Sequence, residues 1–215
     1  MDSVTSCLLV LALMAPQTLE PTDDIWVYPH AVDQTDDLYL RAWGDGVDSV
    51  GDIEMGGFSF SLLQFDLSEI SIDGKKLKSA VLRLMHDADA GFTRGESRDS
   101  PLEVRMAESG FDEKRWSFAS AASYTPESGK KAIVGQQSAR PSDDGEPFAI
   151  EINLLKGEVD FGAALAKAAS GKSKVIALAL TSSIAPEGAD GALYKFFSRS
   201  AEEKLRPQLI LEFDE

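Results

Sequence analysis

Two β-rich runs between Ser59 and Met85 constrain the fold more than any other part of the sequence. The first reads SFSLLQFDLSEI, the second reads AVLRLM, and the polar link SIDGKKLKS joins them. Apolar residues recur at every second position, on one face at Leu63, Phe65 and Leu67 and then at Ala80, Leu82 and Leu84. Because side chains alternate across a strand, both runs predict strands at the centre of an antiparallel β-sandwich.

The rest of the chain repeats this pattern and contains one helical segment. Turn residues separate further apolar runs at 25–28, 38–43, 102–107, 132–136, 148–153, 175–180, 194–198 and 208–213. The run at 175–180 is apolar on both faces, which is typical of a buried central strand. Asp160 and Gly171 bracket a short predicted helix over 161–170. The fold class is therefore all-β, an antiparallel β-sandwich with one short helix.

The N-terminus is expected to direct secretion. Residues 7–15 (CLLVLALMA) are apolar, are too short to span a membrane, and resemble a secretory signal over 1–15. The segment before them has no Lys or Arg, so a misassigned start or a buried N-terminal strand is the alternative. Residues 16–24 are interpreted as a linker and residues 25–215 as a single β-sandwich domain. The predicted location is secreted or at the cell surface.

The net charge of the chain makes some classes of binding partner unfavourable. The net charge is −15, so nucleic acid and anionic membrane surfaces are disfavoured at long range. Cys7 is the single cysteine and lies in the predicted signal, so disulfides and cysteine-based sites are not expected in the mature chain.

Several segments resemble one known family. A strand ends in a basic residue (Leu38-Tyr39-Leu40-Arg41), and Leu63-Gln64-Phe65-Asp66-Leu67-Ser68 and Ser79-Ala80-Val81-Leu82-Arg83-Leu84 follow. Near the end stand Phe196-Phe197-Ser198-Arg199 and Arg206-Pro207-Gln208-Leu209. This order is similar to the DNRLRE-domain family, which is also classed with carbohydrate-binding modules and has alginate-binding members.

The resemblance runs from about residue 25 to residue 213 and implies a secreted jelly-roll sandwich. Members usually accompany polysaccharide-degrading enzymes or surface proteins. The family usually shows a Trp followed by an acidic residue and then a Thr-Trp pair, which only Phe111-Asp112-Glu113 and Trp116 approximate here. That departure concerns ligand specificity more than fold.

The residues themselves also predict an acidic glycan ligand. Cations and rings recur on the predicted outward faces of several strands, at Tyr39, Arg41, Trp43, Arg83, Arg105, Lys195 and Arg199. Guanidinium groups bind carboxylates through paired hydrogen bonds, and a ring beside them can stack on a sugar. The predicted function is a non-catalytic carbohydrate-binding module for acidic polysaccharide, for example a uronate polymer.

A structural role is the alternative for the same cations. Arg41, Arg83 and Arg105 can pair across the sheet with Glu103, Asp66 or Glu151, and Arg199 and Arg206 can tie loops to backbone carbonyls. The protein is then a structural or adhesive module whose partners are other extracellular proteins.

A structural calcium ion is the one cofactor considered. Asp45, Asp48, Asp52 and Glu54 lie in a glycine-rich loop, where oxygen ligands suit calcium. The Asp23-Asp24 and Asp36-Asp37 pairs contribute if they lie nearby. Simple solvation of these acids is the alternative.

No sequence motif favours catalysis. His30 and His86 are the only histidines, and neither stands in a metal-binding motif. A polysaccharide lyase or hydrolase is kept as an alternative, with Tyr39 or Tyr194 beside Arg41 or Lys195 as a base.

Overall fold

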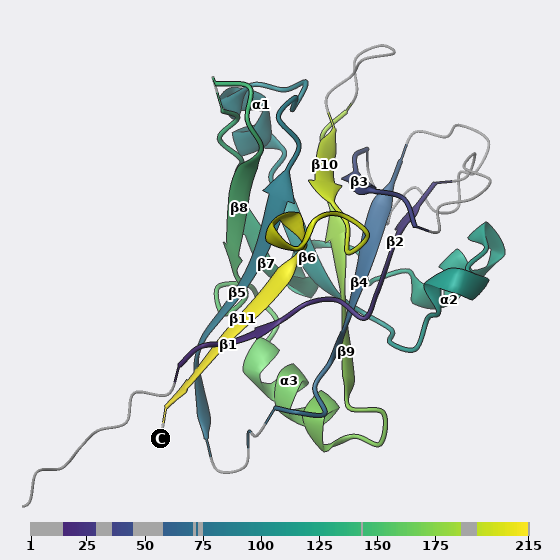
Figure 1. Cartoon of the computed structure of the whole chain (residues 1–215), viewed down its shortest axis with the longest axis vertical. Helices are drawn as coiled ribbons and strands as arrows, with labels where there is room; N and C mark the ends of the chain where they lie inside the picture. The colour runs from purple at the N-terminus through teal and green to yellow at the C-terminus, as the bar shows by residue number, and fades with distance from the viewer. Residues whose placement is uncertain are drawn as a thin grey trace, which may run out of the picture.

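The structure is a computed structural model that describes residues 15–28, 36–44, 58–70, 72, 75–142, 144–185 and 193–214. In these residues two antiparallel β-sheets face each other, and short helices lie at their ends and edges (Figure 1). The predicted all-β sandwich is therefore confirmed.

The first layer, the six-stranded sheet, is centred on one long strand. Its described strands are β1 (Gln17–Leu19), β3 (Tyr39–Ala42), β5 (Lys76–His86), β8 (Phe148–Asn153), β10 (Tyr194–Phe197) and β11 (Gln208–Asp214). They follow the order β1-β11-β5-β10-β3, and β8 pairs with the other edge of β5. Because β5 carries neighbours on both edges, its outward side chains lie in the middle of the sheet.

The second layer, the five-stranded sheet, has the order β2-β4-β9-β6-β7. Its described strands are β2 (Asp23–Val27), β4 (Phe60–Asp66), β6 (Leu102–Ala107), β7 (Ile133–Gln137) and β9 (Val175–Thr181). Strand β9 lies between β4 and β6 and is buried over almost its whole length. The prediction of a buried central strand at 175–180 is confirmed.

The two runs that define the fold belong to opposite layers. Leu63 and Phe65 of β4 point toward Leu82 and Leu84 of β5, and all four are fully buried in one core between the sheets. The alternation read from the sequence therefore assigned these side chains to the correct face.

A second core lies on the outer face of the five-stranded sheet. Phe60, Leu62 and Val27 point away from the first core and pack beneath Phe111 and Ala121. The covering segment contains two 3₁₀ turns, Glu113–Arg115 and Phe118–Ser120, and the short helix α2 (Ala121–Tyr124). The segment that contains Phe111 therefore folds back onto the outer face of this sheet.

The helices agree in part with the prediction. Helix α3 (Phe161–Ser170) is capped by Asp160, which accepts the backbone N–H of Ala163 at 2.9 Å. The expectation of a single helix is wrong, because α1 (Arg94–Asp99) and α2 also form. Helix α1 begins at a reciprocal capping box in which Thr93 and Glu96 bond each other's backbone N–H groups.

The expected linker over 16–24 is wrong. Residues 17–19 form β1, which pairs with Leu209–Leu211 of β11, and β2 already begins at Asp23. The expected strand near 132–136 is confirmed as β7, which lies at one edge of the five-stranded sheet. Two further 3₁₀ turns, Lys130–Ala132 and Glu203–Leu205, precede β7 and β11.

Candidate functional site

The outer face of the six-stranded sheet carries rings and cations in adjacent rows. In β3 and β10 the residues Leu40, Ala42, Tyr194 and Phe196 are buried. The alternate residues therefore point outward, and they are Tyr39, Arg41, Lys195 and Phe197. Cross-strand register places Lys195 opposite Arg41 and Phe197 opposite Tyr39.

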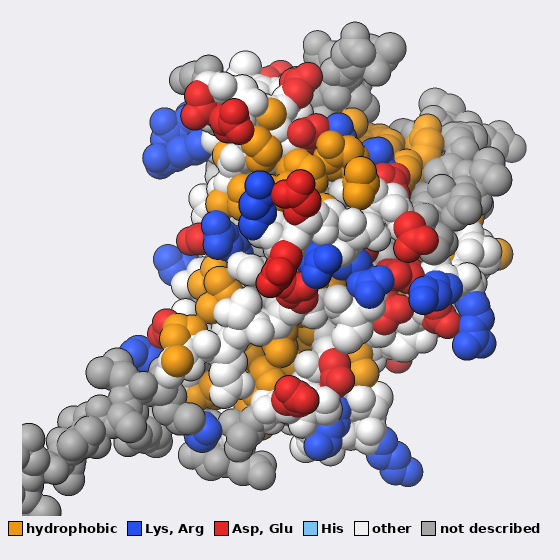
Figure 2. All heavy atoms as spheres, in the orientation of Figure 1, with side chains coloured by type: hydrophobic (Ala, Val, Ile, Leu, Met, Phe, Trp, Pro, Cys, Tyr) orange, Lys and Arg blue, Asp and Glu red, His pale blue; other side chains and the backbone are white. Residues whose placement is uncertain are grey.

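An apolar row crosses the sheet from β3 to β5. The rings of Tyr39 and Phe197 lie 5.2 Å apart between centroids and are half-buried. Phe196 pairs with His86, and both are buried, so Phe197 and Met85, the partly exposed residues next to this pair, lie on the same outer face. We call Tyr39, Phe197 and Met85 the ring row. Figure 2 shows apolar side chains gathered over β10 with charged side chains around them.

One flank of the ring row is cationic, and each cation has an acidic partner. Arg41 Nη1 lies 2.8 Å from Asp37 Oδ2, and its guanidinium carbon is 4.3 Å from the Trp26 ring centroid. Lys195 Nζ lies 2.6 Å from Asp87 Oδ2 and 4.0 Å from the Tyr39 ring centroid. The two cationic side chains keep 21% and 29% of their surface exposed. They stay accessible while the carboxylates and rings hold them in place.

Arg83 lies on the other flank of the ring row. It stands between Gln208 of β11 and Glu151 of β8, and its Nε is 3.9 Å from a Glu151 oxygen. With 41% of its side chain exposed, Arg83 is the least constrained of the predicted ligand-binding arginines. Its pairing with Glu151 agrees with one of the expected cross-strand pairs.

Arg105 does not share this face. It lies on β6 in the five-stranded sheet and is 7% exposed. Its guanidinium pairs with Glu103 at 2.7 Å and donates to Thr181 and to the backbone carbonyls of Glu127 and Gly129. These bonds hold the segment after α2 against the sheet, so the prediction that Arg105 lies on an outward, ligand-binding face is wrong.

Two other predicted ligand residues also lie off the ring row. Trp43 is buried and packs against Tyr28 with 5.2 Å between ring centroids. Arg199 follows β10 and turns toward β2, where its guanidinium pairs with the buried carboxylate of Glu113. Both residues close the edge between the two sheets.

The same edge holds a buried carboxyl group with an altered pKa. Asp24 accepts the backbone N–H of Arg199 at 2.7 Å, and its own N–H donates to Glu113 at 3.0 Å. Burial is the main cause that raises the pKa of Asp24 to about 7, and the nearby Glu113 charge raises it further. The Arg199 amide and guanidinium act in the opposite direction.

Only part of the expected calcium site belongs to the described residues. Asp45, Asp48, Asp52 and Glu54 lie outside the described residues. Among the described residues no group of three or more acidic, His or Cys side chains is arranged to hold a metal. Asp37 instead accepts hydrogen bonds from Trp26 and Arg41, and Asp23 accepts one from Gln64.

His86 joins β5 to β10 on the inner side of the sheet, behind the ring row. Its Nε2 accepts the Lys195 backbone N–H at 3.0 Å, which leaves Nδ1–H to donate to the Asp87 carbonyl at 2.7 Å. Burial is the main cause that lowers the pKa of His86 to about 4. The ring is therefore neutral near pH 7, and it fixes the strand that carries Lys195.

The sequence prediction omitted three residues of this surface, Phe197, Met85 and Trp26. Phe197 and Met85 occupy outward positions that strand alternation alone would have identified. Trp26 belongs to the other sheet, so only the folded chain shows that it supports Arg41.

Comparison with known proteins adds no assignment, since the sequence matches no protein-family model and no curated protein at a significant level. Across the described residues, none of the helices combines the length and apolar character needed to cross a membrane.

Proposed function

We propose that this protein is a secreted or cell-surface, non-catalytic module that binds acidic polysaccharide through the ring row and its flanking cations. The observation that carries the proposal is the side-by-side placement of Tyr39 and Phe197, with Lys195 and Arg41 in the adjacent row. The binding surface is narrower than the sequence suggested, because Arg105, Arg199 and Trp43 serve the fold.

The chemistry of the surface suits a uronate chain. Half-exposed aromatic rings provide apolar area for the C–H face of a sugar, and an open sheet face accommodates an extended polymer. The Arg41 hydrogen bonds to Asp37 and to the Tyr39 carbonyl use Nη1, and no bond of its Nε or Nη2 is found within the described residues. Those donors suit a sugar carboxylate.

Both cations, Arg41 and Lys195, already have an acidic neighbour, and this limits the expected affinity for an acidic polysaccharide. A sugar carboxylate must share Arg41 with Asp37 and Lys195 with Asp87, so each contact contributes a fraction of a full ion pair. The net charge of −15 also opposes a polyanion until the surfaces are close. We therefore expect weak binding by one module, supported mainly by the rings.

A structural or adhesive module is the second candidate function. The burial of Arg105 and the pairing of Arg199 with Glu113 favour it, because these cations strengthen the sandwich and face no ligand. This candidate predicts that the ring row makes no contribution to glycan retention.

Affinity gel electrophoresis separates the two candidates. The full chain is run in gels containing alginate, pectin or chitosan, together with Tyr39→Ala and Phe197→Ala. We expect retardation by alginate or pectin, and a loss of most of it in both variants.

The matched control is Leu38→Ala. Leu38 precedes Tyr39 and is 52% exposed. The substitution Leu38→Ala therefore also removes an exposed apolar side chain, but one outside the ring row. Retention by chitosan alone, or equal retardation of all variants, would overturn the proposal. Reducing sugar or unsaturated product released from the same polymers would instead support an enzyme.

A further inference from the structure

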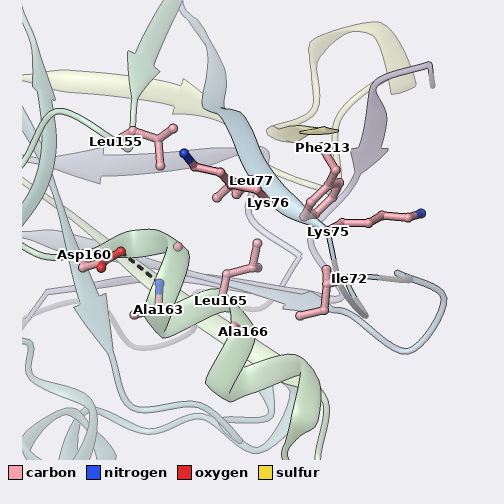
Figure 3. A pocket seen from close by; sticks show the side chains of 11 residues that line it. Ile72, Lys75, Lys76, Leu77, Leu155, Asp160, Ala163, Leu165, Ala166 and Phe213 are labelled. Atoms are coloured by element: carbon pink, nitrogen blue, oxygen red, sulfur yellow. Dashed lines mark hydrogen bonds between the residues drawn. The ribbon is translucent and has the colours of Figure 1, made fainter. Parts of the chain in front are cut away.

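A cavity of about 290 Å³ opens where α3 meets the ends of β5 and β11 (Figure 3). It lies at the other end of the sandwich from the ring row (Figure 1). Its walls are mainly apolar, and the principal lining side chains are Ile72, Leu77, Leu155, Leu165, Phe213 and Lys76. The volume is just below the usual range for small-molecule sites, about 300–1,000 Å³.

A β-bulge builds one wall of the cavity. Glu212 pairs with Ser79, but the next residue, Phe213, pairs with Leu77, so Lys78 is an extra residue in β5. The bulge reverses the alternation of β5 and turns Leu77 to the side occupied by Phe213 and the main core. The two side chains then lie over Leu165, which projects from α3 (Figure 3).

The cavity leaves apolar surface open to water. Leu155 at its rim is 40% exposed, and within the described residues only Leu38 is a more exposed large apolar side chain. Leu77, Phe213 and Ile72 are only half-buried. Apolar surface gathered in a hollow commonly marks a binding site.

The mouth carries positive charge. Lys76 is exposed, and Figure 3 shows its ammonium group reaching toward Leu155, whereas Lys75 extends to the other side. The one acidic lining residue, Asp160, already caps α3 through the Ala163 N–H. A ligand for this site therefore needs an apolar body and an anionic end near Lys76.

We propose that the cavity binds a medium-chain aliphatic carboxylate. Its hydrocarbon tail packs among Leu77, Leu165 and Phe213, and its carboxylate meets Lys76 at the rim. This site is separate from the ring row and does not depend on the proposed polysaccharide binding.

Calorimetric titration of the full chain with octanoate, and separately with 1-octanol, tests the proposal. We expect one saturable site for octanoate and binding of octanol that is weaker by about threefold to fivefold, since a solvent-exposed ion pair contributes little. Lys76→Glu is expected to weaken octanoate by at least that factor and to leave octanol unchanged. Lys172→Glu, an exposed lysine beyond α3, is the matched charge control and should bind as the wild type does.

Gly162→Leu tests the cavity itself. A Cβ atom at Gly162 would lie 3.9 Å from Leu77 Cδ2, so a leucine side chain there points toward the space reserved for the tail. Leu is also a better helix former than Gly, so α3 should be retained, and a thermal melt checks this. We expect octanoate affinity to fall more than tenfold. Should this variant not fold, Leu155→Asp at the exposed rim makes the same test.

Non-saturable uptake of octanoate, or unchanged affinity in a folded cavity variant, overturns the proposal. Equal binding of octanol and octanoate, with no effect of Lys76→Glu, overturns the assignment of the carboxylate to Lys76.

Discussion

The outer faces of the two sheets differ in what covers them. On the five-stranded sheet, Phe60, Leu62 and Val27 are fully buried beneath the segment that contains Phe111 and α2. On the six-stranded sheet, Tyr39 and Phe197 are half-exposed, and no described element covers them. Side chains alternate in the strands of both sheets. The difference in cover therefore depends on which residues occupy the outward positions.

The composition of each outward row explains this difference. The outward positions of β4 include Phe60 and Leu62. Exposing these apolar side chains to water would cost free energy, and the segment that contains Phe111 and α2 covers them. The outward positions of β5 include Arg83 beside Met85, and a covered arginine would need a buried partner. The covered face therefore contributes stability, and the open face is the one that can meet a ligand.

The largest expected effect is the contrast between Phe60→Ala and Phe197→Ala. Phe60 is 0% exposed, so its truncation leaves a cavity and should lower the free energy of unfolding by about 3–5 kcal/mol. Phe197 is half-buried and should lose about 1 kcal/mol. Urea unfolding followed by circular dichroism measures both values. Similar losses would show that the outer face of the six-stranded sheet is also a core.

The pH response should also differ between the two sheets, beginning with His86 behind the open face. Its pKa is about 4 in the folded chain against an ordinary value of 6.5, so below pH 6.5 the unfolded chain binds a proton first. Stability from this group is complete above pH 6.5 and is lost as the pH falls toward 4, by about 3 kcal/mol in all. Between pH 4 and 7 the free energy of unfolding of the wild type should fall with decreasing pH more steeply than that of His86→Gln. Parallel profiles would mean that His86 is not the group responsible.

Asp24, at the edge of the five-stranded sheet, should respond in the opposite direction. Its folded pKa of about 7 lies above the ordinary 3.8, so the folded chain keeps a proton that the unfolded chain releases. Stability from this group is present at low pH and falls as the pH rises from about 4 to 7. Asp24→Asn should remove that decline in the same titration. A variant that becomes more sensitive to high pH than the wild type would contradict the assignment.

The ion pair beneath the covered edge should matter more than the pairs on the open face. Glu113→Ala leaves the buried Asp24 N–H without its acceptor and removes the partner of the partly exposed Arg199 guanidinium, for an expected loss of about 2 kcal/mol. Glu113→Gln keeps an acceptor and should lose less. Chemical unfolding compares the two variants, and equal stability of both with the wild type would show that the edge is held by packing alone.

Strand alternation predicted much of this architecture, and its limits are physical. It placed Leu63 and Leu82 in one core because parity fixes the face of a side chain relative to its own strand. Parity does not say which sheet a strand joins, so Arg105 was grouped with Arg41 although β6 lies in the other layer.

Short elements escaped prediction for a different reason. β1 has only three residues, QTL, and carries no alternating pattern, so it is a strand only because β11 offers it an edge. Helix α1 did carry a signal, the Thr93–Glu96 capping box, but its polar sequence resembled a loop. The edge network of Asp24, Glu113 and Arg199 joins residues more than eighty positions apart, which no local pattern records.

The smallest expected effect on stability is that of Lys195→Met on the open face. Its ion pair with Asp87 is partly exposed, so the free energy of unfolding should fall by only about 0.5 kcal/mol. The same change removes a charge beside the Tyr39 ring, and retardation by alginate or pectin should weaken while the fold is intact. Lys204→Met, whose pair with Glu202 is about three-quarters exposed, is the matched control and should leave both readings unchanged. A stability loss of several kcal/mol in Lys195→Met, with glycan retention unaltered, would mean that this cation serves the fold as Arg105 does. In that case the open face would be a second structural face, and the ring row would lose its proposed role.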